Sequence, residues 1–223
     1  MLHNSCNIIT HTYLKAQRTK GACPCHKIRI GQFENNKIQL QQNQIFKICC
    51  DDRIGNENEV SISYKSLYKD VKENDYLYID DGKVRLEVKN VKNKEILCQV
   101  IKEGVISNFK GVNIPTTKIN MPSLTEKDIK DVLTCVKFNI DYVALSFVSN
   151  AQDIKQLREL LDKNNGQEIR IIAKIERQVA VNNLEEIIEQ ADVIMVARGD
   201  LGVEIGVENV PKVQKRIIRE SLK

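Results

Sequence analysis

The chain has 223 residues, of which 42% are apolar, and its formal net charge is +4. This apolar fraction is typical of a globular protein and too high for a disordered one. No run of about 18 apolar residues predicts a membrane span, and Lys and Arg are scattered among Asp and Glu without the basic stripe of a nucleic-acid-binding protein.

The first 32 residues have no sustained hydrophobic period and contain all three histidines of the chain. The N-terminus lacks the charged start and long apolar centre of a secretory signal, so the seven cysteines are most simply reduced thiols and we expect a cytoplasmic protein. A zinc cluster is an alternative for this segment, although its spacing fits no standard zinc finger. Its ligands would be Cys6, His11, Cys23, Cys25 and His26.

Residues 33–118 show the pattern of short strands. Polar and apolar residues alternate over 37–40, 59–64 and 84–88, and an apolar run at 76–79 leads into Asp80-Asp81-Gly82. Asp-Gly favours a tight hairpin turn because glycine accepts a positive φ without steric cost. Alternating strands bury one face, and several of them at this spacing favour a small β-barrel or sandwich.

From residue 119 the pattern changes to alternating helices and strands. Thr125 and Asp128 form a near capping box, followed by apolar residues at helical spacing, namely Ile129, Val132, Leu133 and Val136. Buried strands are predicted at 142–147, 170–176 and 193–197, and further helices at 154–161, 184–191 and 207–222. Parallel strands need such crossovers, so the region is α/β, either a βα barrel or an open doubly wound sheet. No G-x-G-x-x-G follows a strand, which disfavours a dinucleotide-binding fold.

Two of the predicted strands end in polar residues. Lys174 and Glu176 close one strand and face the same side, because side chains alternate along a strand. Asp200 follows the next strand, and the carboxyl ends of neighbouring parallel strands meet at one edge. Two carboxylates beside a lysine suit Mg²⁺, and the lysine can neutralise charge on a phosphate or enolate oxygen. Gly199 lets a ligand approach closely, and the N–H groups of Gly199 and Asp200 open a turn that can hold an anion.

Spacing alone leaves simpler interpretations open. Lys174 and Glu176 also fit a surface ion pair, which contributes about 0–1 kcal/mol. Arg198-Gly199-Asp200 also fits a plain turn or an adhesion tripeptide.

Six motifs occur in the order and spacing of one enzyme family, from about Lys27 to the C-terminal end of the chain. They are IDDG at 79–82, KGVNIP at 110–115, LTEKD at 124–128, SFV at 146–148, IAKIE at 172–176 and IMVARGDLGVEI at 194–205. On these motifs the chain resembles the pyruvate kinases.

The resemblance implies a (β/α)₈ TIM-type barrel, incomplete in this chain, with an inserted small β-barrel lid domain. Residues 1–32 would be an N-terminal segment with a partial barrel strand near Ile28, residues 33–118 the lid, and residues 119–223 βα units of the catalytic barrel. About four of the eight barrel strands would be present. The C-terminal domain of the family's homotetramer has no counterpart in this sequence.

The implied reaction transfers phosphate between phosphoenolpyruvate and ADP, giving pyruvate and ATP in the last step of glycolysis, with Mg²⁺ or Mn²⁺ and usually K⁺. By position, Lys174 resembles the lysine that stabilises the transferring phosphoryl group and the enolate. Glu176 and Asp200 resemble the metal ligands, and the backbone amides of Gly199 and Asp200 resemble those that hold the substrate carboxylate. No nucleic acid and no membrane is implied as a partner.

The chain also departs from the family pattern. Arg18 stands where the family usually has an acid, and extra residues precede Lys27, which puts the K⁺ site in question. Ser149 stands where the family often has Arg, and Asn120 where it has an acid. We expect the 223-residue chain alone to be weakly active or inactive. The alternatives are a Mg²⁺-dependent pyruvate aldolase or lyase barrel, against which the long β insertion argues, and a non-catalytic degenerate copy.

Overall fold

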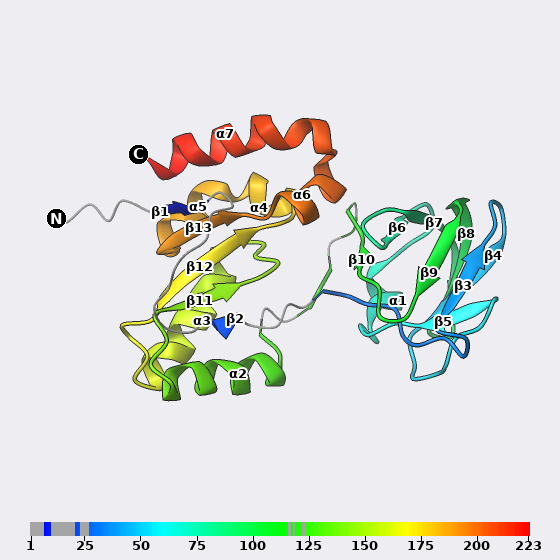
Figure 1. The fold of residues 1–223 in the computed structure, drawn as a ribbon, viewed down its shortest axis with the longest axis horizontal. Coiled ribbons are helices and arrows are strands. Elements are labelled where there is room, and N and C mark those ends of the chain that lie inside the picture. Colours follow the sequence, from blue (N-terminus) through cyan, green and yellow to red (C-terminus); the bar gives the residue numbers. More distant parts are fainter. Residues whose placement is uncertain (1–6, 10–20, 23–26, 116, 118, 122–123) are drawn as a thin grey trace. The chain divides into compact units, whose positions relative to one another are not determined.

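The structure, a computed structural model, describes residues 7–9, 21–22, 27–115, 117, 119–121 and 124–223. The chain divides into two compact units (Figure 1). The first, here called the β unit, is Lys27–Met121, and the second, the α/β unit, is formed by Met1–His26 and Pro122–Lys223. The five ligands of the alternative zinc cluster lie outside the described residues.

The β unit consists of two sheets and a short helix around one apolar core. The order of the larger sheet is β10-β6-β7-β8-β4-β5, and β3 pairs with β9. The elements are β3 (Lys37–Leu40), β4 (Ile45–Cys49), β5 (Glu59–Ser61), α1 (Leu67–Asp70), β6 (Tyr76–Ile79), β7 (Val84–Lys92), β8 (Glu95–Lys102), β9 (Gly104–Ser107) and β10 (Val112–Asn113). Asp80, Asp81 and Gly82 all have positive φ and join β6 to β7, which confirms the predicted hairpin.

The β unit begins at Lys27 rather than at the expected boundary of residue 33. Ile28 and Ile30 are buried in its core, and Arg29 forms a bridge with Gly111. The strand expected near Ile28 therefore belongs to the β unit, and the parallel partner of β11 (Tyr142–Leu145) is instead β2 (Gly21–Ala22). An alternating run of residues shows that one face is buried but not which sheet the strand joins.

The C-terminal end of the β unit is held to α1 by hydrogen bonds. Asn120 donates from its backbone N to Asp70 Oδ2 at 3.0 Å and from Nδ2 to Oδ1 at 2.9 Å, and Tyr64 Oη donates to Oδ2 at 2.7 Å. Burial raises the pKa of Asp70, but these donors outweigh it and leave the pKa below its ordinary value. The amide at position 120 supplies a donor that an acid there would lack.

The α/β unit is built on a five-stranded parallel sheet in the order β1-β13-β12-β11-β2. Besides β2 and β11, its strands are β1 (Asn7–Ile9), β12 (Arg170–Ile175) and β13 (Val193–Val196). A row of helices lies beside the sheet, each in contact with the next: α2 (Glu126–Lys137), α3 (Ala151–Lys163), α5 (Leu184–Gln190) and α7 (Val210–Ser221) (Figure 1). The α/β class is confirmed. Among the described residues, no helix is long and apolar enough to cross a membrane.

The start of α2 follows the sequence prediction, but its buried face differs from it. Thr125 and Asp128 form a complete capping box. Val132 is fully buried, whereas Ile129 and Leu133 are 37% and 39% exposed. The helix thus packs through one side of the predicted apolar stripe.

Asp192 fixes the amino end of β12. Its Oδ2 accepts hydrogen bonds from Ile171 N at 2.7 Å and from Arg158 Nη2 at 2.8 Å, and Arg158 Nη1 donates to Ile169 O at 2.9 Å. We expect Asp192→Ala to lower the free energy of unfolding by about 1–3 kcal/mol, because a strand N–H and a guanidinium lose their acceptor. Thermal unfolding checks this, with the exposed Asp162→Ala on α3 as the matched control. Equal losses in the two variants would contradict it.

Candidate active site

The carboxyl ends of β11 and β12 bring a lysine and a glutamate into contact. Lys174, the fifth residue of β12, lies with Nζ 2.6 Å from Oε1 of Glu176, which directly follows the strand. Lys174 Nζ also donates to Ser146 Oγ at 3.0 Å, just beyond β11. The side chain of Glu176 is 1% exposed and that of Lys174 is 22% exposed. A pair this deeply buried differs from a surface ion pair, because water screens it far less.

The backbone after β11 adopts an unusual conformation that brings a donor to Glu176. Phe147 has a φ of +54°, in the left-handed region that non-glycine residues rarely occupy. Its N–H donates to Glu176 Oε2 at 2.6 Å. Such backbone strain costs of order 1–3 kcal/mol and is concentrated at functional sites.

The electrostatic setting of Glu176 suits a divalent cation. Burial raises the pKa of Glu176, and the nearby carboxylate of Asp200 raises it further. Lys174 and the Phe147 N–H act in the opposite direction. Oε1 is buried, and its contact with Lys174 Nζ is an ion pair that leaves it without a hydrogen bond of normal geometry. A buried carboxylate oxygen with free acceptor capacity, within electrostatic range of a second carboxylate, fits the oxygen ligands of Mg²⁺. Glu176 and Asp200 are therefore the residues of this site that could hold a metal.

Asp200 and Gly199 lie in the first turn of a helix, α6 (Arg198–Ile205), and not in the turn expected from the sequence. The helix starts almost directly after β13, and its N-cap, Ala197, offers no side-chain acceptor. First-turn N–H groups have no partner within their own helix and attract anions. A Cβ at Gly199 would meet nothing within 4 Å, so a ligand has room to approach the backbone there.

Sequence reasoning missed three contributors to this site. Ser146 and Phe147 were recognised as part of a motif, but their contacts with Lys174 and Glu176 were not. No sequence signal shows that Phe147 has a positive φ. A helix starting at Arg198 was also missed, because two glycines within eight residues disfavour a helix prediction.

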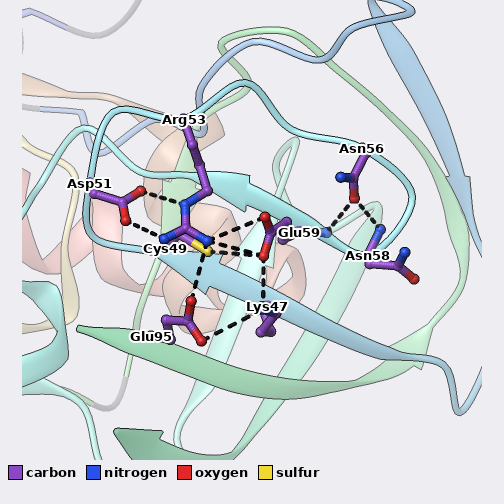
Figure 2. A network of polar contacts seen from close by, with 8 residues as sticks. All are labelled: Lys47, Cys49, Asp51, Arg53, Asn56, Asn58, Glu59 and Glu95. Atoms are coloured by element: carbon purple, nitrogen blue, oxygen red, sulfur yellow. Dashed lines mark hydrogen bonds and ion pairs between the residues drawn. The ribbon is translucent and has the colours of Figure 1, made fainter. Parts of the chain in front are cut away.

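A second group of metal-type ligands lies in the β unit. Within the described part of the chain, ligand atoms of Cys49, Glu59 and Glu95 lie within 4.8 Å of one another. Figure 2 shows the cations among them: Arg53 Nη1 lies 3.2 Å from both glutamates, and Lys47 contacts both as well. Burial raises the pKa of the Cys49 thiol to about 12, so it stays protonated at neutral pH and is a poor ligand. We interpret this group as an ion-pair network that ties β4, β5 and β8 together.

Comparison with known proteins identifies a family to which the chain is similar. The family model for the barrel domain of pyruvate kinase matches residues 4–223. The pyruvate kinase of Clostridium perfringens is 44% identical over 195 residues, which cover 87% of this chain and 41% of the relative. That of Corynebacterium glutamicum is 42% identical over 193 residues, which cover 86% of this chain and 40% of the relative.

Solved structures agree with the sequence comparison. The crystal structure of a pyruvate kinase from Cryptosporidium parvum matches with a TM-score of 0.82 and 35% identity, covering 89% of this chain and 42% of that one. The chain thus spans about two fifths of the length of these relatives. Since the family model covers nearly the whole chain, the chain belongs to the pyruvate kinase family, a family of phosphoryl-transferring kinases.

Proposed function

We propose that this chain carries the metal-binding and phosphoryl-binding part of a pyruvate kinase active site, which transfers the phosphoryl group of phosphoenolpyruvate to ADP. The contact of Lys174 Nζ with the buried Glu176 at the carboxyl end of β12 supports this most directly. In βα proteins, catalytic groups gather at that end of the strands. The family assignment does not favour the aldolase or lyase alternative.

The proposed reaction determines where charge must be offset. The bond from phosphorus to the enol oxygen of phosphoenolpyruvate breaks, and a bond from phosphorus to a terminal oxygen of ADP forms. The enolate left behind takes a proton at its methylene carbon and becomes pyruvate. Negative charge is therefore shared by the phosphoryl oxygens and the enol oxygen during transfer. Lys174 would offset this charge through Nζ, in a site where little water screens it.

Glu176 and Asp200 would hold Mg²⁺ or Mn²⁺. The fit rests on the free acceptor capacity of the buried Glu176 Oε1. When bound, the ion supplies positive charge for the phosphoryl and enolate oxygens. The N–H groups of Gly199 and Asp200 would bind the carboxylate of the substrate at the start of α6. A requirement for K⁺ follows from the family alone, and Arg18, where the family usually has an acid, lies outside the described residues.

We further propose a role for each of the two units. The β unit would be the lid inserted into an incomplete TIM-type barrel, and the α/β unit would supply the βα units of that barrel. We propose the cytoplasm as the place of action. A polypeptide of these 223 residues alone would be weakly active or inactive, because it spans at most about two fifths of the length of the relatives compared above.

Replacing Gly199 with alanine is expected to separate stability from substrate binding. Alanine is about 1 kcal/mol more favourable than glycine within a helix, and the new Cβ meets nothing, so the variant should unfold at a higher temperature. The same Cβ would crowd the N–H groups that bind the substrate carboxylate, so phosphoenolpyruvate should bind about tenfold more weakly. Thermal unfolding and calorimetric titration with phosphoenolpyruvate in the presence of Mn²⁺ measure the two effects. Unchanged affinity would show that substrate does not approach here.

The function itself is tested with reactions that need only the described site. If the chain stabilises the enolate of pyruvate, it should accelerate deuterium exchange at the methyl group of pyruvate in D₂O when Mg²⁺ is present. Formation of ATP from phosphoenolpyruvate and ADP should be weak or absent with this chain alone. Absence of either site-specific Mn²⁺ binding or methyl exchange in the unmodified chain would refute the proposal. Release of pyruvate from a hydroxy-keto acid would favour the aldolase alternative instead.

A further inference from the structure

A contact between the end of β12 and α6 lies one residue beyond Glu176. Arg177 Nε lies 3.9 Å from Glu204 Oε1, and Gln178 N donates to Glu204 Oε2 at 3.3 Å. The side chain of Glu204 is only 3% exposed. A carboxylate this deeply buried needs a cation and hydrogen-bond donors nearby, because it has lost its hydration. Arg177 supplies positive charge to it.

The residues that face each other at this strand end and on α6 have a regular arrangement. Glu176 and Arg177 are consecutive, whereas Asp200 and Glu204 are four residues apart and share one face of α6. Asp200 acts electrostatically on Glu176, and Glu204 pairs with Arg177. A contact at Glu204, one helical turn from Asp200 on the same face, constrains the rotation of α6 about its axis. The contact at Glu204 thus ties the end of β12 to the face of α6 that carries Asp200.

Arg177 also reaches the segment after β11. Its Nη1 donates to Ser149 Oγ at 3.4 Å, and Asn183 Nδ2 donates to Ser149 O at 2.9 Å. The guanidinium thus links the segments that follow two neighbouring strands with α6. Because a guanidinium is planar and carries five N–H donors, it suits such a three-way link better than an ammonium group does.

We propose that Arg177 is a positioning residue of the metal and substrate site: through Glu204 it holds the first turn of α6, with Asp200 and the backbone of Gly199, at a fixed place relative to Glu176. The inference rests on the proposed function. Arg177 would act through Glu204 and not as a ligand of the metal or the substrate. Its loss removes none of the proposed ligands but misaligns the two on α6. Removal of such an outer partner typically weakens metal binding by about 10–100-fold.

The test measures Mn²⁺ binding to the full chain by electron paramagnetic resonance, counting only the binding that Glu176→Gln removes. Arg177→Gln is expected to raise the dissociation constant about tenfold. Arg170→Gln is the matched control, since Arg170 is exposed at the opposite end of the same strand. It should leave the dissociation constant unchanged. Thermal unfolding of both variants identifies any loss that is due to unfolding alone.

A double-mutant cycle shows whether Arg177 acts through Glu204. If it does, Glu204→Gln weakens Mn²⁺ binding as Arg177→Gln does, and the double variant is no worse than the weaker-binding single variant. Glu204→Gln also tests the contact if Arg177→Gln does not fold. Additive losses, or an Arg177→Gln variant that binds as tightly as the unmodified chain, would overturn this inference alone. Absence of site-specific Mn²⁺ binding in the unmodified chain would overturn the proposed function and the inference with it.

Discussion

Replacing Lys174 with methionine is expected to slow metal-dependent deuterium exchange at the methyl group of pyruvate by roughly 100–1000-fold. Exchange passes through an enolate, and Lys174 Nζ is the cation that lies in contact with Glu176 at the carboxyl end of β12. Methionine is similar in length to lysine but carries no charge, so the substitution removes the cation and preserves most of the packing. Proton nuclear magnetic resonance of pyruvate in D₂O with Mg²⁺ gives the rate.

A matched lysine on the surface provides the control for this result. Lys155 is exposed on α3, and Lys155→Met changes the net charge by the same amount. It should exchange pyruvate at the unmodified rate. If Lys174→Met retained that rate as well, Lys174 would be only the partner of a structural ion pair. A drop in both variants would indicate a general effect of charge.

The repeating part of the α/β unit could be predicted because each signal is local. Strands begin at 142, 170 and 193, as the apolar runs predict, and Thr125 caps α2 as its spacing to Asp128 predicts. The contact of Lys174 with Glu176 follows from alternation along one strand. In each case the residues that carry the signal are neighbours in the sequence.

Other features depend on contacts between distant parts of the chain. Ile28 joins the core of the β unit, although its alternating pattern would serve equally well in a barrel strand. The positive φ of Phe147 exists where a buried acceptor, Glu176, 29 residues away, holds it. The tie between Arg177 and Glu204 likewise joins two elements whose approach no local pattern encodes.

Replacing Glu176 with glutamine is expected to abolish site-specific Mn²⁺ binding and yet preserve the fold. Glutamine keeps the shape of the side chain and can still accept from the Phe147 N–H, and Lys174 remains bonded to Ser146 and partly exposed to water. The loss of a direct ligand should exceed the roughly 10–100-fold that an outer partner costs. Paramagnetic resonance measures the binding. Unchanged affinity would exclude Glu176 as a ligand.

The stability of this variant has a predicted dependence on pH. Burial raises the pKa of Glu176 above its value in the unfolded chain, so the folded state favours the protonated form. The protonated Glu176 side chain therefore contributes fully to the stability of the unmodified chain below about pH 4.5, and this contribution is lost as the pH rises through the folded pKa of Glu176. Glutamine has no such ionisation, so the melting temperature of Glu176→Gln relative to the unmodified chain should be higher at pH 7.5 than at pH 4.5. An equal difference at the two pH values would contradict a raised pKa.

Adding metal should raise the melting temperature of the unmodified chain at pH 7.5 but not that of Glu176→Gln. Mn²⁺ at about 100 times its dissociation constant stabilises the unmodified chain by about 2.7 kcal/mol, because it binds the folded state alone, whereas Glu176→Gln gains nothing. A carboxylate kept only for an ion pair with Lys174 would show no such difference, since metal would act on both chains alike. A metal-dependent rise in melting temperature that only the unmodified chain shows would mean that the buried charge of Glu176 serves to bind a cation. An equal response of the two chains would mean that the charge is purely structural.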